Sequence, residues 1–343
     1  MALQEILETL CRIPGVSGDE SAVASAILSM IEEHCDAEID ALGNVIARKK
    51  GARASSRKIL LDAHMDEVGL IINGIADDGS LTFATVGGID ARVLIGRQVL
   101  VGEDALPGVI GGKPIHLQDA EERKTAVPAD KLYIDIGCAS RDEAEKLVQL
   151  GDTVTFLPEF APFGNGAFRG KAIDNRFGCA VLIDLIQSDL PVDCTFVFSV
   201  QEETGGLGAA AAAFSQQPDI AIAVEATSAA DLPGISEPDC ACKLGKGAVV
   251  SFMDKGALYP RPLYRRCMEL ASQKEIPAQL KTAIAGRNDA AAYQRGAAGA
   301  QVVAISAPCR YIHAPQCVIR QDDMQAVRDL IGALLENLAN EME

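Results

Sequence analysis

Short runs of β-branched and aromatic residues recur along this chain, and several end abruptly in histidine or acidic residues. The run at 59–61 leads into His64, and the run at 196–198 leads into Glu202 and Glu203. Runs of this length and composition are typical of buried strands. In open α/β sheets, ligands bind beyond the carboxyl ends of the strands. The pattern therefore predicts a sheet with a functional site at the carboxyl ends of its strands.

The same arrangement recurs further along the sequence. Residues 219–224 run into Glu225, and the run at 300–305 continues through a proline to His313. Between the first two segments, Asp174 opens an apolar helix. Each residue alone has a structural explanation, such as a helix cap for Asp174 or a solvated pair for the adjacent glutamates. Together they form one set of two imidazoles and four carboxylates: His64, Asp174, Glu202, Glu203, Glu225 and His313.

The chemistry of this set favours a metal centre. Mixed imidazole and carboxylate ligands suit zinc, cobalt, manganese or iron, and the absence of thiolates argues against a structural zinc site. A single catalytic zinc usually takes three protein ligands and a water, so the set is too large for one ion. It fits two divalent ions bridged by a carboxylate and a water, about 3.5–4 Å apart, as in hydrolytic two-metal sites.

The segment between His64 and Asp174 differs from its flanks in the pattern of its predicted secondary structure. From residue 67 to residue 163 the chain shows short β-branched runs separated by glycine-containing turns, with turns expected at Asp78-Gly79 and Pro107-Gly108. The flanking segments alternate strand with helix. We therefore predict an α/β fold in which residues 1–66 and 164–343 form one domain and residues 67–163 an inserted β domain. A long polar loop is expected at 113–129.

Composition excludes several classes of protein. The chain of 343 residues carries a formal net charge of -17, which argues against nucleic acid or an anionic membrane as a partner. No segment reaches the roughly 20 apolar residues of a membrane span. The N-terminal residues form an amphipathic helical pattern without the basic start of a signal peptide. The ten cysteines show no paired metal spacing, and they indicate a cytoplasmic protein with reduced thiols.

Six motifs in this chain resemble those of the glutamyl aminopeptidase family of dinuclear metallopeptidases. This family includes the tetrahedral aminopeptidases and proteins once labelled endoglucanases. The resemblance covers nearly the whole chain. Its motifs are Val16-Ser17-Gly18, Ala63-His64-Met65-Asp66-Glu67-Val68-Gly69, Ile89-Asp90-Ala91-Arg92-Val93-Leu94, Lys171-Ala172-Ile173-Asp174-Asn175-Arg176, Glu202-Glu203-Thr204-Gly205 and Arg310-Tyr311-Ile312-His313-Ala314-Pro315.

The resemblance implies a role for each residue of the set. His64 and Glu225 would hold one metal ion, Glu203 and His313 the other, and Asp174 would bridge the two. Asp66 would accept the second ring N–H of His64, fixing its tautomer. Glu202 would be the general base. The resemblance also suggests a cis peptide bond after Asp174. One departure stands out, because relatives often have aspartate where this chain has Glu225.

The resemblance further implies a fold, a reaction and an assembly. The fold is a mixed-sheet metallopeptidase domain with helices on both faces and a small barrel-like insert. The reaction is removal of N-terminal residues from peptides, by attack of a water that bridges two divalent ions, with zinc or cobalt favoured and manganese an alternative. The insert would mediate dimerisation, and dimers would assemble into hollow tetrahedral dodecamers.

Other functions remain open from the sequence alone. An inactive or scaffolding homologue would explain the departure at Glu225. A deacylase or carboxypeptidase would need a cationic group for the substrate carboxylate. A glycosidase would need two carboxyls flanking a sugar bond, and it leaves the two histidines without a role. Arg287 is a candidate partner for an acidic first side chain of the peptide, or else a surface arginine paired within its own loop.

Overall fold

A large mixed sheet forms the centre of the protein, for which we obtained a computed structural model describing residues 1–341. Eleven strands make up this sheet, and four adjacent ones run parallel at its middle. In spatial order the continuous path is β1 (Asp36–Ile39), β2 (Val45–Lys49), β12 (Cys194–Ser199), β3 (Ile59–His64), β13 (Ile220–Ser228), β16 (Gln301–Arg310), β17 (Cys317–Arg320), β11 (Ala167–Gly170) and β10 (Phe160–Pro162). The short strands β14 (Ala248–Val250) and β15 (Ala278–Leu280) extend it beside β16.

Helices cover both faces of the sheet because its central strands are apolar on both sides. In β3, Leu61 packs into the larger core and Leu60 into the smaller core on the opposite face, as the two-residue period of a strand requires. The larger core is closed by α1 (Leu3–Cys11), α2 (Ser21–Ile31), α4 (Ile173–Gln187), α6 (Arg261–Gln273) and α8 (Gln321–Asn340). The smaller core is closed by α5 (Leu207–Gln216) and α7 (Ala290–Arg295).

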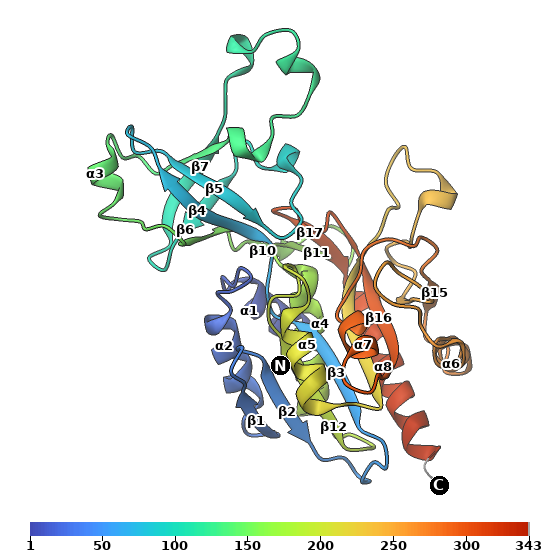
Figure 1. Ribbon diagram of the computed structural model, residues 1–343. Helices are drawn as coiled ribbons and strands as arrows, with labels where there is room; N and C mark the ends of the chain where they lie inside the picture. Colours follow the sequence, from blue (N-terminus) through green and yellow to red (C-terminus); the bar gives the residue numbers. More distant parts are fainter. Residues whose placement is uncertain (342–343) are drawn as a thin grey trace.

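A closed six-stranded barrel projects from one end of this α/β body (Figure 1). Its strands pair around the barrel in the order β4, β5, β8, β7, β6, β9. The barrel has a core of its own, which includes Leu70, Phe83 and Ile134. Strand bounds are β4 (Gly69–Ile75), β5 (Leu81–Val86), β6 (Gln98–Val101), β7 (Leu106–Gly111), β8 (Tyr133–Asp135) and β9 (Thr153–Phe156), with the short helix α3 (Arg141–Ala144) before β9. The predicted fold class is therefore confirmed.

One of the two predicted turns in the barrel is misplaced. Asp78 and Gly79 do form the turn between β4 and β5, where Gly79 has a φ of 84°. The turn expected at Pro107-Gly108 lies instead at residues 102–105, and Pro107 and Gly108 belong to β7. Gly108 is needed there for packing, because a Cβ at this position would lie 2.7 Å from Ile134.

The long loop predicted at 113–129 contains no strand and only short 3₁₀ turns, η2 (Ile115–Leu117), η3 (Glu122–Lys124) and the start of η4 (Ala129–Lys131). All ten cysteines lie among the described residues and carry free thiols. Across residues 1–341, no helix has both the length and the apolar character needed to cross a bilayer.

Candidate metal centre

The carboxyl ends of the four parallel strands bring the predicted residues to one edge of the sheet. His64 is the last residue of β3, and Ser199, the last residue of β12, pairs with it in register. Glu225 lies in β13 opposite Ser306 of β16, and His313 follows the end of β16. Because these strands run in the same direction, residues more than a hundred positions apart in sequence meet at one place.

Strand β12 breaks before the two adjacent glutamates. It ends at Ser199, and Gln201 then takes a positive φ of 57°. Neighbouring residues of a continuous strand point to opposite faces, so this break is what allows both Glu202 and Glu203 to face the site. Gly206, with a φ of 71°, then begins α5. The sequence predicts this interruption from the glycines that follow the glutamates.

Asp174 enters the site from the start of α4. Its φ and ψ of -84° and 104° depart from the helix, and the peptide bond between Asp174 and Asn175 is cis. The predicted cis bond is thus confirmed. The Asn175 side chain donates to the Val224 carbonyl at 2.8 Å, which ties this turn to β13. The carboxylate of Asp174 is left to point toward both imidazoles.

Strand β13 continues beyond Glu225, which sequence analysis placed at the end of the run. Pairing with β16 extends to Ser228, so Glu225 projects from within a strand and is only 4% exposed. Its Oε1 is buried and has no hydrogen-bond partner within residues 1–341. A buried carboxylate oxygen without a partner is costly unless another group, such as a cation, satisfies it.

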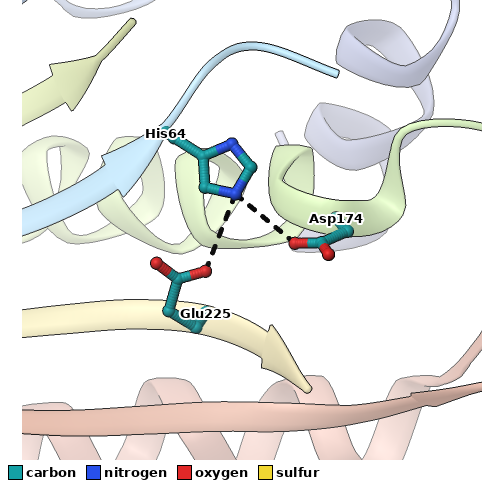
Figure 2. Close-up of side chains that lie close together, drawn as sticks. All are labelled: His64, Asp174 and Glu225. Carbon is teal, nitrogen blue, oxygen red and sulfur yellow. Dashed lines mark ion pairs between the residues drawn. The ribbon is translucent and has the colours of Figure 1, made fainter. Parts of the chain in front are cut away.

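Two overlapping ligand groups share Asp174. In the first, His64 Nε2 lies 3.4 Å from Asp174 Oδ1 and 3.8 Å from Glu225 Oε2 (Figure 2). In the second, His313 Nε2 lies 3.0 Å from Glu203 Oε1 and 3.5 Å from Asp174 Oδ2. The donor atoms within each group all lie within 4.8 Å of one another. Different oxygens of one carboxylate thus face the two imidazoles.

Asp66 contacts three residues of this cluster, His64, Glu202 and Glu203. Its Oδ1 lies 3.3 Å from His64 Nδ1, and its backbone carbonyl lies 3.2 Å from the same nitrogen. The carboxylate also accepts the backbone N–H groups of Glu202 at 3.0 Å and Glu203 at 3.1 Å. Asp66 therefore orients the imidazole and fixes the loop that carries both glutamates.

The three glutamates of the site are destabilised as anions. Burial raises the pKa of Glu202 to about 8, and the nearby Asp289 and Glu203 add to this increase while His64 opposes it. Burial also raises the pKa of Glu203, and it raises the pKa of Glu225 well above its usual value. Four carboxylates in so small a volume repel one another unless protons or metal cations compensate their charge.

The histidines show the complementary effect. Burial disfavours the charged imidazole of His313, but hydrogen bonding with Asp174 and Glu203 outweighs it and raises the pKa to about 11. Burial likewise opposes the charged form of His64, while Asp174 and Asp66 raise its pKa well above the usual value. For Asp174, the two histidines overcome the effect of burial and lower the pKa. Without a metal ion, the neighbouring carboxylates thus favour the protonated imidazoles, whereas metal binding requires the unprotonated ones.

These features fit divalent metal ions. The donors are nitrogen and oxygen atoms only, two of their three groups share the Asp174 carboxylate, and within residues 1–341 the buried Oε1 of Glu225 lacks a partner. His34 and His116, which sequence analysis left outside the set, are both exposed.

Metal binding should release protons, because the raised pKa values of His64, His313, Glu203 and Glu225 all favour the protonated side chains over the free ligands. Raising the pH removes these competing protons, so apparent metal affinity should increase between about pH 6 and 8. Calorimetric titration with zinc in two buffers of different ionisation enthalpy measures the released protons directly. Identical heats in both buffers would contradict this prediction.

A cavity of about 340 Å³ opens over the cluster. Its lining includes the acidic ligands, and also Lys281, Arg287 and Asn288. Lys281 Nζ donates to the Ala285 carbonyl at 3.0 Å. Within the described part of the chain, the Arg287 side chain has no hydrogen bond or ion pair, so it is not paired within its own loop. The cavity lies in the size range of small-molecule sites.

Sequence reasoning missed three contributors. Ser17 Oγ donates to Asp66 Oδ2 at 2.6 Å. The Gly88 carbonyl lies 2.9 Å from His313 Nδ1, and a Cβ on Gly88 would lie only 3.4 Å from that nitrogen. Ser199 donates to the buried Asp289 at 2.7 Å beneath the site. Ser17 stands in a motif that carries the resemblance, but no residue type signals a backbone carbonyl such as that of Gly88.

Comparison with known proteins places the chain among aminopeptidases. The model of the M42 glutamyl aminopeptidase family matches residues 43–330. The chain is similar to lysyl aminopeptidase of Pyrococcus furiosus, with 31% identity over 97% of each chain. It is also similar to a TET aminopeptidase from a marine sediment thaumarchaeote (32% identity, 99% of each chain, TM-score 0.94). The TET1 peptidase of Pyrococcus horikoshii gives 36% identity over 97% of this chain and 99% of that one, with a TM-score of 0.86.

The fold and these comparisons place the chain in the aminopeptidase class. The chain belongs to the M42 glutamyl aminopeptidase family.

Proposed function

We propose that this protein is a cytosolic aminopeptidase that uses two divalent ions, zinc or cobalt, to remove N-terminal residues from peptides. The observation that carries the proposal is the pair of ligand groups that share Asp174 at the floor of the cavity. Membership in an aminopeptidase family supports the reaction class, and the free thiols support a reducing compartment.

Five side chains would hold the ions: His64 and Glu225 on one side, Glu203 and His313 on the other, with Asp174 between them. When bound, such ions polarise a carbonyl and lower the pKa of water from 15.7 toward about 7. Asp66 keeps His64 in place for this task. Glu225, which is one methylene longer than the aspartate common in relatives, reaches to within 3.8 Å of His64. The longer side chain thus still reaches the ligand cluster.

Glu202 would move the proton. Its carboxylate is partly buried beside His64 and Glu203, yet no hydrogen bond within residues 1–341 engages it. Burial raises its pKa to about 8, near the operating pH that favours proton transfer in both directions. Glu202 would take a proton from the attacking water and deliver it to the departing amine. Its backbone N–H, held by Asp66, fixes the position of the side chain.

Hydrolysis of a panel of aminoacyl anilides, with zinc, cobalt or manganese added, tests the proposal. Cleavage should require a free α-amine, stop on chelation and return with metal. N-acetylated anilides should not be cleaved. Metal-dependent cleavage of acylated substrates alone would favour a deacylase instead.

An inactive scaffold is the main alternative. The intact ligand groups and the cavity above them argue against it. Metal analysis separates the two: roughly two ions per chain supports the enzyme, and none supports the scaffold. A glycosidase finds less support, because two of the residues facing the cavity are imidazoles held against carboxylates.

We expect Arg287 to select acidic first residues. Its guanidinium lines the cavity without a protein partner in the described residues, and it can bind a carboxylate through two hydrogen bonds. Arg287→Ala should lower kcat/KM on a glutamyl anilide by about tenfold and leave a leucyl anilide nearly unchanged. Lys281→Ala is a matched comparison, since Lys281 lines the same cavity but donates to a backbone carbonyl. Equal rates for Arg287→Ala and the parent on both substrates would exclude the arginine as selector.

We also propose that the inserted β domain mediates assembly. We predicted this domain at residues 67–163; the barrel strands span residues 69–156, and β10 within the predicted range pairs in the central sheet instead. The TET1 peptidase of Pyrococcus horikoshii assembles into a tetrahedron or a large octahedral shell. The barrel projects from the α/β body and exposes apolar residues such as Ile115 and Leu150, which are 70% and 65% exposed. Mass measurement in solution should give a dimer at least, and a dodecamer if the shell forms. A strictly monomeric, active protein would contradict this expectation.

A further inference from the structure

A second cavity lies at the opposite end of the central sheet from the metal centre. Its volume is about 580 Å³, and it is formed where β2 ends and where β3 and β12 begin, beside the end of α5. The β2–β3 connection lies at the end of the sheet farthest from the barrel (Figure 1). Ile59 lines this cavity at the start of β3, and His64 ends the same strand five residues later. At 3.3 Å per residue, the two positions are about 17 Å apart. A ligand bound here would not touch the metal centre.

The walls of this cavity are basic in a strongly acidic chain. Six of the 31 basic residues fall within residues 48–58, and no acidic residue occurs between positions 41 and 61, although the whole chain has a net charge of -17. Five of the six line the cavity, against two acidic residues, Asp36 and Asp193. The five are Arg48, Lys49, Lys50, Arg57 and Lys58.

Most of these cations have no carboxylate partner among residues 1–341. Arg48 pairs with Glu38 at 2.8 Å, and Arg57 is 3.4 Å from Glu341. In the described part of the chain, Lys49 Nζ donates only to the neutral carbonyl of His34, at 3.0 Å. Within residues 1–341, neither of the remaining two ammonium groups, those of Lys50 and Lys58, has a hydrogen bond or an ion pair. The acidic Asp193 is itself engaged, because its Oδ1 accepts the Gly51 N–H at 2.9 Å.

We propose that this basic cavity, defined by the five cations above, binds a small organic molecule that carries two or more phosphate groups. Several cations around one concave volume favour a ligand with separated negative charges, and guanidinium groups bind phosphate in bidentate fashion. The volume is in the range of small-molecule sites. A run of basic residues alone would be a solvated surface. Here the basic residues line a cavity together with Asp36, residues 193–195, Ser215, Gln216 and Pro218.

Isothermal titration of the full-length protein with fructose 1,6-bisphosphate at low ionic strength tests the proposal. This ligand has two separated phosphates and is uncharged apart from them. We expect saturable binding of one molecule per chain, weakening with added salt. Fructose should not bind, and orthophosphate should bind more weakly than the bisphosphate. Absence of binding to the parent protein would overturn the proposal.

Charge reversal locates the binding site. The double variant Lys50→Glu with Lys58→Glu should weaken binding by at least about tenfold. The control variant Lys124→Glu with Lys146→Glu makes the same change in net charge on the barrel and should leave the affinity unchanged. A milder variant, Lys50→Gln with Lys58→Gln, provides a second measurement without introduced repulsion and should also weaken binding.

Three results would refute the assignment. Unchanged binding in both lysine double variants would place the bisphosphate elsewhere, including at the metal centre. Equal weakening in the control would show only a general charge effect. Binding of hexaglutamate through the same lysines with equal or higher affinity would identify the site as one for acidic peptides instead.

Discussion

Replacing Glu202 with glutamine is expected to lower kcat by about 10²–10⁴-fold while leaving both metal ions and substrate binding nearly intact. The amide keeps the size and hydrogen-bonding capacity of the side chain but cannot accept the proton. Glu202 forms a third possible ligand group with His64 and Glu203, but unlike those two residues it is in neither of the groups that share Asp174. The loss should therefore fall on kcat rather than KM, which is the pattern of an interaction made mainly in the transition state.

Glu203→Gln is the matched comparison, because the two residues are adjacent on one loop. Glu203 Oε1 lies 3.0 Å from His313 Nε2 within a ligand group, so its replacement should weaken one metal site and make activity depend on added metal. Metal analysis and single-substrate kinetics on both variants give the answer. If Glu202→Gln loses metal while Glu203→Gln keeps it, the two roles are reversed. If neither variant changes the rate, the proposed site is wrong.

Much of the sheet could be predicted from sequence because its central strands are buried on both faces. The runs before His64 and before Glu202 are apolar throughout, and they form β3 and β12. Barrel strands were harder to delimit, since β7 contains both Pro107 and Gly108, which normally indicate a turn. Tertiary pairing with β6 and close packing against Ile134 decide that segment, and neither is visible in local composition.

Most members of the candidate site could be predicted because they follow or end an apolar run, and strand direction then brings these ends together. Asp174 is the exception, since it opens an apolar helix. Their arrangement was not. Only the structure shows that Asp174 faces both imidazoles, and that β13 continues past Glu225 and leaves its Oε1 buried without a partner in the described chain. The Gly88 contact crosses the boundary of the inserted segment, and the Ser17 contact joins two residues that lie 49 positions apart in sequence. Sequence spacing carries no signal for such contacts.

A buried cluster of charged residues near the site links three segments whose relative positions determine the geometry of the metal centre. Glu67, Lys171 and Arg176 are 2%, 1% and 0% exposed. Glu67 forms an ion pair with Lys171, and its Oε1 also accepts the Gly15 N–H at 3.0 Å and the Thr155 hydroxyl at 3.2 Å. This carboxylate therefore ties together the N-terminal segment, the barrel and the strand-to-helix turn that precedes Asp174.

Glu67→Leu should destabilise the protein by about 3–5 kcal/mol, because it leaves the Lys171 ammonium buried without an acid. Urea unfolding at fixed protein concentration measures the loss. The double variant Glu67→Leu with Lys171→Met should recover part of it, since no unpaired ammonium remains, although Arg176 stays charged. Burial already lowers the pKa of Lys171, so the unfolded state binds more protons there, and the stability of Glu67→Leu should rise as the pH increases. A double variant no more stable than Glu67→Leu would show that the hydrogen bonds from Gly15 and Thr155, rather than the ion pair, set the contribution of Glu67.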